Sequence, residues 1–354
     1  MMPEASCPGE AVWMPLLAGE RLPSELQRHL DGCAACRRAV ERLRNELDTM
    51  RTLTDSIVLT AATPMRRPGD LGRYVIVGEL GTTIATRDYR ALEIMRDQDV
   101  VVRLSRHSVR KDDMVRDRLL EEGKRLTEIK HPHLVSVRDL DFFGDQPFLV
   151  TEYVRGVPLP TYVESRLPSP TVAARWVASL ARAVVAMHQA GICHWDIKPA
   201  TVLIDEDASA RLTEVGMTRL RQLGTEAFGS ASVGSPAFMA PEQARGDSAL
   251  MGPATDQFAL SGLLFFLLTG RPPFTGKDLP TILSRARRCE IPADLLTKSN
   301  VPRLLETVCL RALAERPHQR FPSAADFAQS LDASVGGVPS LTSTWFGQSW
   351  TPQR

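Results

Sequence analysis

Long apolar stretches are missing from this 354-residue sequence. The longest apolar run, residues 258–268, is interrupted by Ser261 and Gly262, whereas a membrane-spanning helix needs about 20 consecutive apolar residues. We therefore expect a buried core helix at this position and no membrane span. The first ten residues also lack a basic start followed by an apolar stretch, so no signal peptide is expected.

An excess of charge of either sign is missing as well. The 43 Lys and Arg residues nearly balance the 42 Asp and Glu residues, which leaves a formal net charge of +1. This balance implies no general attraction to nucleic acid or to an anionic membrane. With 43% hydrophobic and 24% charged residues, the composition is that of a soluble globular protein.

Cysteine is scarce, with six residues in the whole chain. A secreted domain held together by disulfides would be smaller and denser in cysteine, so we expect a reducing, cytoplasmic location. Three cysteines lie in the first forty residues: Cys7, Cys33 and Cys36. The other three are scattered and are expected to be core thiols rather than reactive ones: Cys193, Cys289 and Cys309.

The length of the chain suggests two or three folded units. Residues 1–50 contain a helical pattern of apolar residues over 24–47, and residues 51–72 have the Thr, Arg and Pro content of a linker. Residues 73–335 form the main folded segment. The tail, 336–354, is rich in Ser, Thr and Gly and is expected to be disordered.

Within the main segment, strand patterns come first and helix patterns follow. Short β-branched and aromatic runs predict antiparallel strands in residues 74–92, 100–104 and 148–152. Periodic apolar residues predict helices in residues 172–189, 255–269 and 302–314. This order favours an α+β fold with a β-rich small half and an α-rich large half.

Several short motifs of the main segment resemble those of one enzyme family. Residues 194–201 (HWDIKPAT) resemble the catalytic loop of protein kinases, and residues 214–216 (EVG) stand where the family has its magnesium-binding Asp-Phe-Gly. Residues 234–242 (GSPAFMAPE) resemble the end of the activation segment. Residues 256–260 (DQFAL) resemble the start of the central buried helix of a kinase.

Further matches lie on either side of these motifs. Glu122 precedes His131 by nine positions, the offset of the αC glutamate in the family, and residues 151–154 (TEYV) resemble the gatekeeper and hinge. Arg320 stands where the family pairs an arginine with the Pro-Glu glutamate, here Glu242. Each string is weak alone, but their order and spacing resemble the bacterial, eukaryote-like Ser/Thr protein kinases, with a β-rich N-lobe and an α-helical C-lobe.

The resemblance implies roles for individual residues. Asp196 would orient the attacking hydroxyl, and Lys198 would touch the γ-phosphate of ATP. The remaining positions of the implied ATP and magnesium site are Gly81, Arg103, Glu122, Glu152, Val154, Thr201 and Glu214.

The phosphate-binding positions depart from the family pattern. The glycine-rich loop G-x-G-x-x-G is represented by Gly81, Thr83 and Thr86, so only its first glycine remains. Arg103 replaces the strand lysine. It keeps the charge and could pair with Glu122, but its planar fork is not interchangeable with an ammonium group.

The metal-binding positions are also altered. Thr201 stands in for the asparagine that holds the second magnesium ion, and Glu214 replaces the metal-binding aspartate. The extra methylene of Glu214 matters because magnesium demands near-ideal octahedral geometry at about 2.0–2.1 Å. A displacement of about 1 Å can reduce the rate roughly a hundredfold.

The adenine pocket and the activation switch differ too. Asp88 aligns with the valine that roofs the adenine ring, and Val101 with a small alanine. A carboxylate facing an apolar base is unfavourable unless it is paired; with the register shifted by one residue, Asp88 would point outward instead. Trp195 replaces the arginine that receives an activation-segment phosphate, so phosphorylation of Thr225 or Ser230 would lack that receiver.

These departures favour a pseudokinase, a kinase-fold signalling module that binds protein partners and has lost phosphoryl transfer or retains it only weakly. The alternative is a divergent, active Ser/Thr kinase that uses Arg103, Asp196 and Glu214. Residual binding of nucleotide is compatible with either.

The first segment contains the spacing C-x21-H-x3-C-x2-C, formed by Cys7, His29, Cys33 and Cys36. Tetrahedral zinc takes sulfur and imidazole ligands, and the last three residues fall on one face of a helix at this spacing. The pattern resembles the small zinc-binding domain of anti-sigma factors, which in that family binds partner proteins. The other interpretation is a helical hairpin with buried thiols. A third hypothesis for the whole chain is that the zinc module carries the function and the kinase fold contributes none.

Overall fold

The computed structural model describes residues 23–33, 36–37, 40, 71–82, 86–106, 113–164, 166–218 and 235–336. The chain divides into two compact units, Met1–Arg66 and Arg67–Arg354. The predicted linker (apart from residues 71–72), the predicted tail after residue 336, and Cys7, Thr225 and Ser230 lie outside the described residues.

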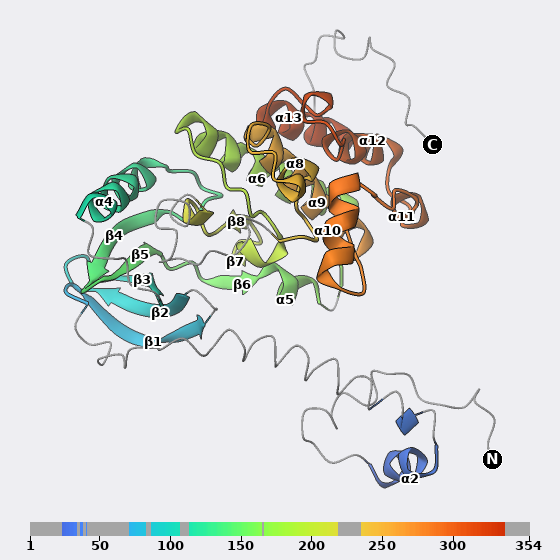
Figure 1. Ribbon diagram of the computed structural model, residues 1–354, viewed down its shortest axis with the longest axis horizontal. Coiled ribbons are helices and arrows are strands. Elements are labelled where there is room, and N and C mark those ends of the chain that lie inside the picture. The colour runs from blue at the N-terminus through green and yellow to red at the C-terminus, as the bar shows by residue number, and fades with distance from the viewer. Residues whose placement is uncertain are drawn as a thin grey trace. The chain divides into compact units, whose positions relative to one another are not determined.

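The second unit begins with a five-stranded antiparallel sheet in the order β1-β2-β3-β5-β4 (Figure 1). Its strands are β1 (Tyr74–Thr82), β2 (Thr86–Glu93), β3 (Gln98–Ser105), β4 (Val137–Phe143) and β5 (Gln146–Glu152). Helix α4 (Asp113–Glu128) packs against β4. The predicted strands are therefore confirmed, and together they form the small lobe.

Alternation along β2 and β3 gives the sheet two different faces. Tyr89, Ala91, Val100 and Val102 are buried in an apolar cluster on one face. Asp88, Arg90, Val101 and Arg103 belong to the opposite face, because side chains alternate along each strand. Asp88 thus shares a face with Arg103, and the outward-pointing alternative for Asp88 is excluded.

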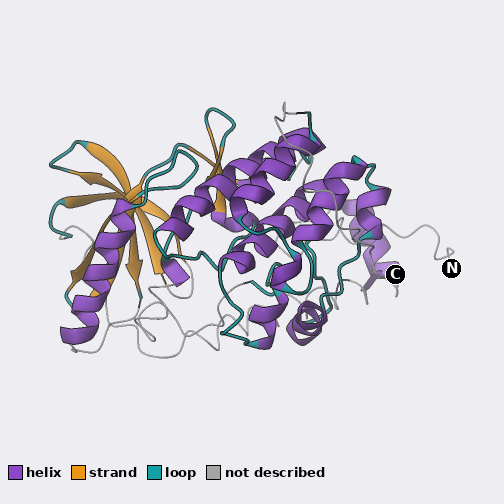
Figure 2. Cartoon of the chain, turned by 90° about the horizontal axis from the view of Figure 1, so that it is seen from above, coloured by secondary structure: helices purple, strands orange, loops and turns teal. Residues whose placement is uncertain are grey.

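The rest of the unit is mostly helical, and Figure 2 shows most of the helices at one end of it and most of the strands at the other. The helices are α5 (Leu159–Val163), α6 (Pro170–Gln189), α8 (Pro241–Arg245), α9 (Pro253–Thr269), α10 (Leu279–Arg288), α11 (Asp294–Lys298), α12 (Arg303–Ala312) and α13 (Ala324–Ser334), with 3-10 turns η4 (Pro199–Thr201) and η5 (Pro317–Gln319). A small sheet has the order β6-β7-β8, from β6 (Gly156–Pro158), β7 (Val202–Asp205) and β8 (Ala210–Leu212).

Helix α9 is the centre of this large lobe. Phe258, Leu260 and Phe265 are fully buried in it, so the buried core helix predicted from the interrupted apolar run is confirmed. Helix α6 packs against both α9 and α13. Ser169 caps its first turn by accepting a hydrogen bond from the Val172 N–H, which starts the helix two residues before the predicted position. Among the described helices, none is both long enough and apolar enough to cross a membrane.

In the first unit, α2 (Ser24–Gly32) is followed, beyond Cys33, by helical backbone at residues 36–37 and 40. It ends earlier than the predicted helical stretch, and Cys33 directly after it has extended backbone, with its N–H donating to the His29 carbonyl. Leu30, Cys36 and Val40 form a small buried cluster. A separate zinc-binding domain in residues 1–50 stays a prediction.

Candidate functional site

Asp196 and Lys198 lie side by side in the loop between α6 and η4. The Lys198 ammonium donates to Asp196 Oδ2 at 2.7 Å. Asp196 is only 7% exposed, and its other oxygen, Oδ1, is buried with no hydrogen-bond partner among the described residues. The loop therefore presents one satisfied and one unsatisfied carboxylate oxygen.

A carboxylate of α9, that of Asp256, holds the backbone of this loop. Asp256, which is fully buried, accepts the N–H of His194 at 2.9 Å and the N–H of Trp195 at 2.7 Å. His188 on α6 lies 2.8 Å from the same carboxylate. Trp195 has φ +60°, in the left-handed region, so the carboxylate holds a conformation that a bulky residue does not adopt readily. His188 therefore helps to fix Asp256.

Thr201 directs its hydroxyl into the loop itself. The Thr201 Oγ1 accepts the Lys198 N–H at 3.1 Å and lies 3.0 Å from the Lys198 carbonyl, to which it donates. The residue is fully buried. Its oxygen is thus used to close the η4 turn, which is a different task from holding a metal ion.

Arg103 is held by two carboxylates. Its Nε and Nη2 donate to Asp88 at 2.9 and 2.6 Å, in a bidentate pair across β2 and β3. Its Nη1 lies 3.5 Å from Glu214 Oε1. All three guanidinium nitrogens therefore face an anionic group. The predicted pairing of Arg103 with Glu122, a buried residue of α4, stays a prediction.

The charge of Arg103 is secured by these partners. Burial works against the charged form, but the hydrogen bonds to Asp88 and the negative charges of Glu214 and Asp88 outweigh it, and the pKa of Arg103 is raised above its usual value. Glu214 itself has φ +60°, and the next residue but one, Gly216, has φ +76° with Leu126 of α4 so close that a Cβ there would clash. Leu126 thus leaves no room for a side chain at Gly216, two residues after Glu214.

The hinge between the lobes is joined by Glu152. Its carboxylate accepts the N–H of Ser136 at 3.0 Å and pairs with Arg211 of β8. Arg211 also donates to the Leu134 carbonyl at 3.1 Å. The Glu152 side chain therefore ties the start of the hinge to the large lobe. Val154, the other predicted hinge residue, is half-buried two positions further on.

Gly81 lies near the end of β1, opposite Asp88 in the strand register. A Cβ at this position would meet no atom within 4 Å. Val101 is half-buried on the face that carries Arg103.

Comparison with known proteins agrees with this arrangement. Residues 74–331 match the family described as "Protein kinase domain". The chain belongs to the protein kinase family. The match covers both lobes, so the resemblance inferred from the motifs is confirmed at the level of the family and the fold.

Among curated proteins, the kinase domain is similar to bacterial Ser/Thr kinases. It is 32% identical over 261 residues to the serine/threonine-protein kinase PrkC of Bacillus subtilis, which covers 73% of this chain and 40% of the relative. It is 31% identical over 284 residues to PknB of Mycobacterium tuberculosis, covering 78% of this chain and 45% of the relative. The chain spans less than half the length of these relatives.

Solved kinase domains have the same fold. The PknI kinase domain of Mycobacterium tuberculosis matches with a TM-score of 0.55 at 27% identity, over 75% of this chain and 96% of that one. A double mutant of that domain matches with a TM-score of 0.58 at 24% identity, over 75% and 96%.

Protein kinases use ATP and magnesium, and the residues of this kinase domain do not fit that pair as the family holds it. Glu214 faces Arg103 at 3.5 Å, and the Thr201 oxygen closes a turn. Arg103 stands where the family has the lysine that contacts the phosphates, and its guanidinium group forms a bidentate hydrogen bond with Asp88. Asp196 and Lys198 keep the residue types of the family and contact each other.

Sequence reasoning missed the partners of these residues. The bond between Asp88 and Arg103 could have been found from the β2–β3 hairpin, since the two residues are directly opposite each other in its register. No comparable local signal connects Glu152 with Arg211, which are 59 positions apart. The pairing of Glu242 with Arg320, predicted from the family pattern, is present with Nη1–Oε1 and Nη2–Oε2 distances of 2.7 and 2.8 Å.

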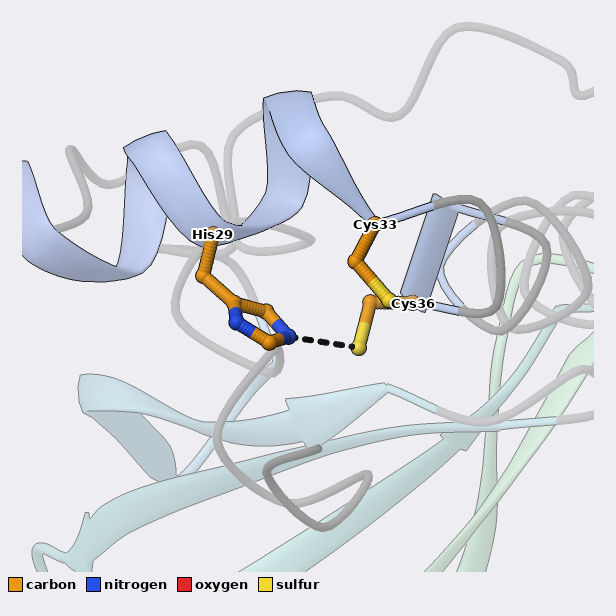
Figure 3. Close-up of side chains that lie close together, drawn as sticks. All are labelled: His29, Cys33 and Cys36. Carbon is orange, nitrogen blue, oxygen red and sulfur yellow. Dashed lines mark hydrogen bonds between the residues drawn. The ribbon is translucent and has the colours of Figure 1, made fainter. Parts of the chain in front are cut away.

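In the first unit, three of the four predicted zinc ligands converge (Figure 3). The His29 Nε2, Cys33 Sγ and Cys36 Sγ atoms all lie within 4.8 Å of one another, and His29 Nε2 is 3.3 Å from Cys36 Sγ. This set of one imidazole and two thiols matches the donor chemistry of zinc. Cys7 lies outside the described residues, so its part in the cluster stays a prediction.

The other cysteines belong to the large lobe. Burial raises the pKa of the Cys309 thiol to about 12, and it does the same for Cys193 and Cys289. Such thiols are protonated at neutral pH and are poor nucleophiles.

Proposed function

We propose that this chain is a pseudokinase, a cytoplasmic signalling module in which the kinase fold binds a protein partner and transfers phosphate weakly or not at all. The observation that carries the proposal is that the side chains at both magnesium-binding positions already contact other protein groups. The Glu214 carboxylate faces Arg103, and the Thr201 hydroxyl is used inside its own loop.

Phosphoryl transfer depends on positioning and on stabilisation of charge by metal ions. With both metal positions engaged elsewhere, the charge that develops on the transferred group would lack its main counter-charge. Loss of a single such group reduces rates by about a hundredfold or more. Loss of two supports a scaffold rather than an efficient enzyme.

The second candidate is a divergent active kinase. The Asp196 and Lys198 pair favours it, because an aspartate oxygen that is buried and unpartnered among the described residues suits a hydroxyl donor. In that case Asp196→Asn would abolish transfer.

Thermal unfolding of the full chain with and without ATP and magnesium tests the proposal. A ligand at a hundredfold over its Kd stabilises by about 2.7 kcal/mol, which shifts Tm by a few degrees in a domain of this size. We expect no shift at millimolar ATP and no labelling of a generic Ser/Thr protein substrate. Magnesium-dependent labelling that disappears in Asp196→Asn would replace the pseudokinase by the enzyme.

For the first unit, we propose a structural zinc site with His29, Cys33 and Cys36 as ligands and Cys7 as the fourth, in a module that contributes to partner binding. The support is the convergence of three donors beside a very small apolar cluster, since small cores rarely suffice without a metal. One zinc per chain in the purified protein, lost in Cys33→Ser/Cys36→Ser, is the expected result. Wild-type protein without metal would contradict it.

A further inference from the structure

The pair formed by Asp88 and Arg103 lies where β2 and β3 face Glu214, a place called the cleft below. Both residues stand at positions where the motif pattern has other residue types, a valine and a lysine. They are directly opposite each other on β2 and β3 and are 18% and 19% exposed. The pair is therefore partly shielded from water, and its charge-assisted bidentate bonds are stronger than hydrogen bonds between neutral groups.

The N–H donors of Arg103 that Asp88 and Glu214 occupy determine how a phosphate could bind this residue. A guanidinium group has five N–H donors on three nitrogens, and bidentate recognition of a phosphate uses two of these donors along one edge. Asp88 takes Nε and Nη2 of Arg103, and Glu214 faces Nη1. A phosphate that uses the Nε–Nη2 edge of Arg103 must displace Asp88, and one that approaches the remaining N–H groups meets the negative charges of both carboxylates.

We propose that Asp88 is an internal competitor for nucleotide phosphate, whose carboxylate occupies the phosphate-binding edge of Arg103. The inference rests on the proposed function and deepens it. The altered metal-binding positions account for the weak transfer proposed above, whereas the Asp88 carboxylate sets how weakly the polyphosphate itself binds. Removing one negative charge from the cleft should therefore restore affinity for ATP even without magnesium.

The same two strands provide a matched control. Arg90 and Asp99 form a second bidentate pair, with Nη2–Oδ2 and Nε–Oδ1 distances of 2.7 and 3.2 Å. Their side chains are 40% and 29% exposed. Asp99→Asn removes the same charge from the same sheet and leaves Arg103 with its partners.

The test is the binding of ATP, and separately of adenosine, to the full chain by equilibrium dialysis in EDTA. Asp88→Asn keeps the volume of the side chain and is expected to bind ATP at least tenfold more tightly than the wild type, which corresponds to 1.4 kcal/mol. Affinity for adenosine should stay the same, because adenosine has no phosphate. Asp99→Asn should change neither affinity.

Two further variants locate the effect. Asp88→Ala should also gain affinity for ATP, and Asp88→Asn/Arg103→Met should lose the gain, since the released guanidinium is then absent. Circular dichroism confirms that each variant is folded. Unchanged ATP affinity in both Asp88 variants, or an equal gain for adenosine, would overturn the assignment.

The two proposals fail in different ways. Efficient phosphate transfer by the wild-type chain would refute the pseudokinase proposal. The ATP affinities of the Asp88 variants would still decide the role of Asp88. Unchanged affinities with no transfer would refute only the role of Asp88.

Discussion

Two arginine–carboxylate pairs with similar geometry lie in different surroundings in this kinase domain. In the large lobe, Arg320 donates to Glu242 at 2.7 and 2.8 Å, and both side chains are almost completely buried. In the cleft, Arg103 donates to Asp88 at 2.9 and 2.6 Å, with nearly a fifth of each side chain exposed. The first pair matches the motif pattern of the family, and both members of the second depart from it.

The two arginines also differ in the elements that they connect. Besides Glu242, Arg320 donates to the carbonyls of Ala254, Ala314 and Glu315. It joins α8, α9 and the segment after α12, so its loss would disrupt the lobe. Arg103 joins two neighbouring strands that are already paired along their length. The fold can therefore keep its architecture while the chemistry of the cleft is changed.

The largest expected effect is that of Arg320→Leu. It leaves Glu242 buried without its counter-charge, which is expected to lower the free energy of unfolding by about 3–5 kcal/mol. Urea unfolding of the full chain, followed by circular dichroism, measures it. Glu242→Gln/Arg320→Leu should recover part of the loss, and a loss below 1 kcal/mol for Arg320→Leu would refute the contrast between the two pairs.

Asp256→Asn should have the next largest effect. The carboxylate accepts two backbone N–H groups and contacts His188, whereas an amide has only one acceptor oxygen. We expect a decrease of about 2–3 kcal/mol in the free energy of unfolding, since hydrogen bonds to charged groups contribute about 1.5–3 kcal/mol. Asp332→Asn, in a half-exposed pair with Arg182, is the control and should have a small effect.

The large lobe should also be sensitive to alkaline pH. Because burial raises the pKa of Cys309 from 9.0 to about 12, the thiol stabilises the fold fully below pH 9 and loses this contribution as the pH rises. At pH 10 the loss is about 1.4 kcal/mol. The free energy of unfolding of Cys309→Ala should fall less between pH 8 and pH 10 than that of the wild type, and parallel curves would contradict the prediction.

The smallest effects are expected in the cleft. Asp88→Asn should lower the free energy of unfolding by only about 1 kcal/mol, because the pair is partly solvated and Glu214 remains near Arg103. Asp99→Asn should leave the unfolding midpoint unchanged. If Asp88→Asn lowered the free energy of unfolding as much as Arg320→Leu does, the Asp88–Arg103 pair would have a structural role like that of the Glu242–Arg320 pair, and the contrast between the two pairs would be refuted.

The sequence predicted well what depends on local pattern or on family spacing. The α+β order, the buried helix at residues 258–268 and the Glu242–Arg320 pair were all anticipated. Side-chain partners across strands were not, because a one-residue shift of register moves Asp88 to the other face. The predicted single helix through His29, Cys33 and Cys36 was wrong at Cys33, where the backbone is extended directly after α2.

Glu242 and Arg320 are 78 positions apart in the chain. A ribosome adds about 5–20 residues per second, so Glu242 precedes its partner by roughly 4–16 s during synthesis. Through that interval its carboxylate has no counter-charge and is kept in water by the cost of burial. The large lobe can therefore bury Glu242 with its counter-charge only after the segment that follows α12 has been made.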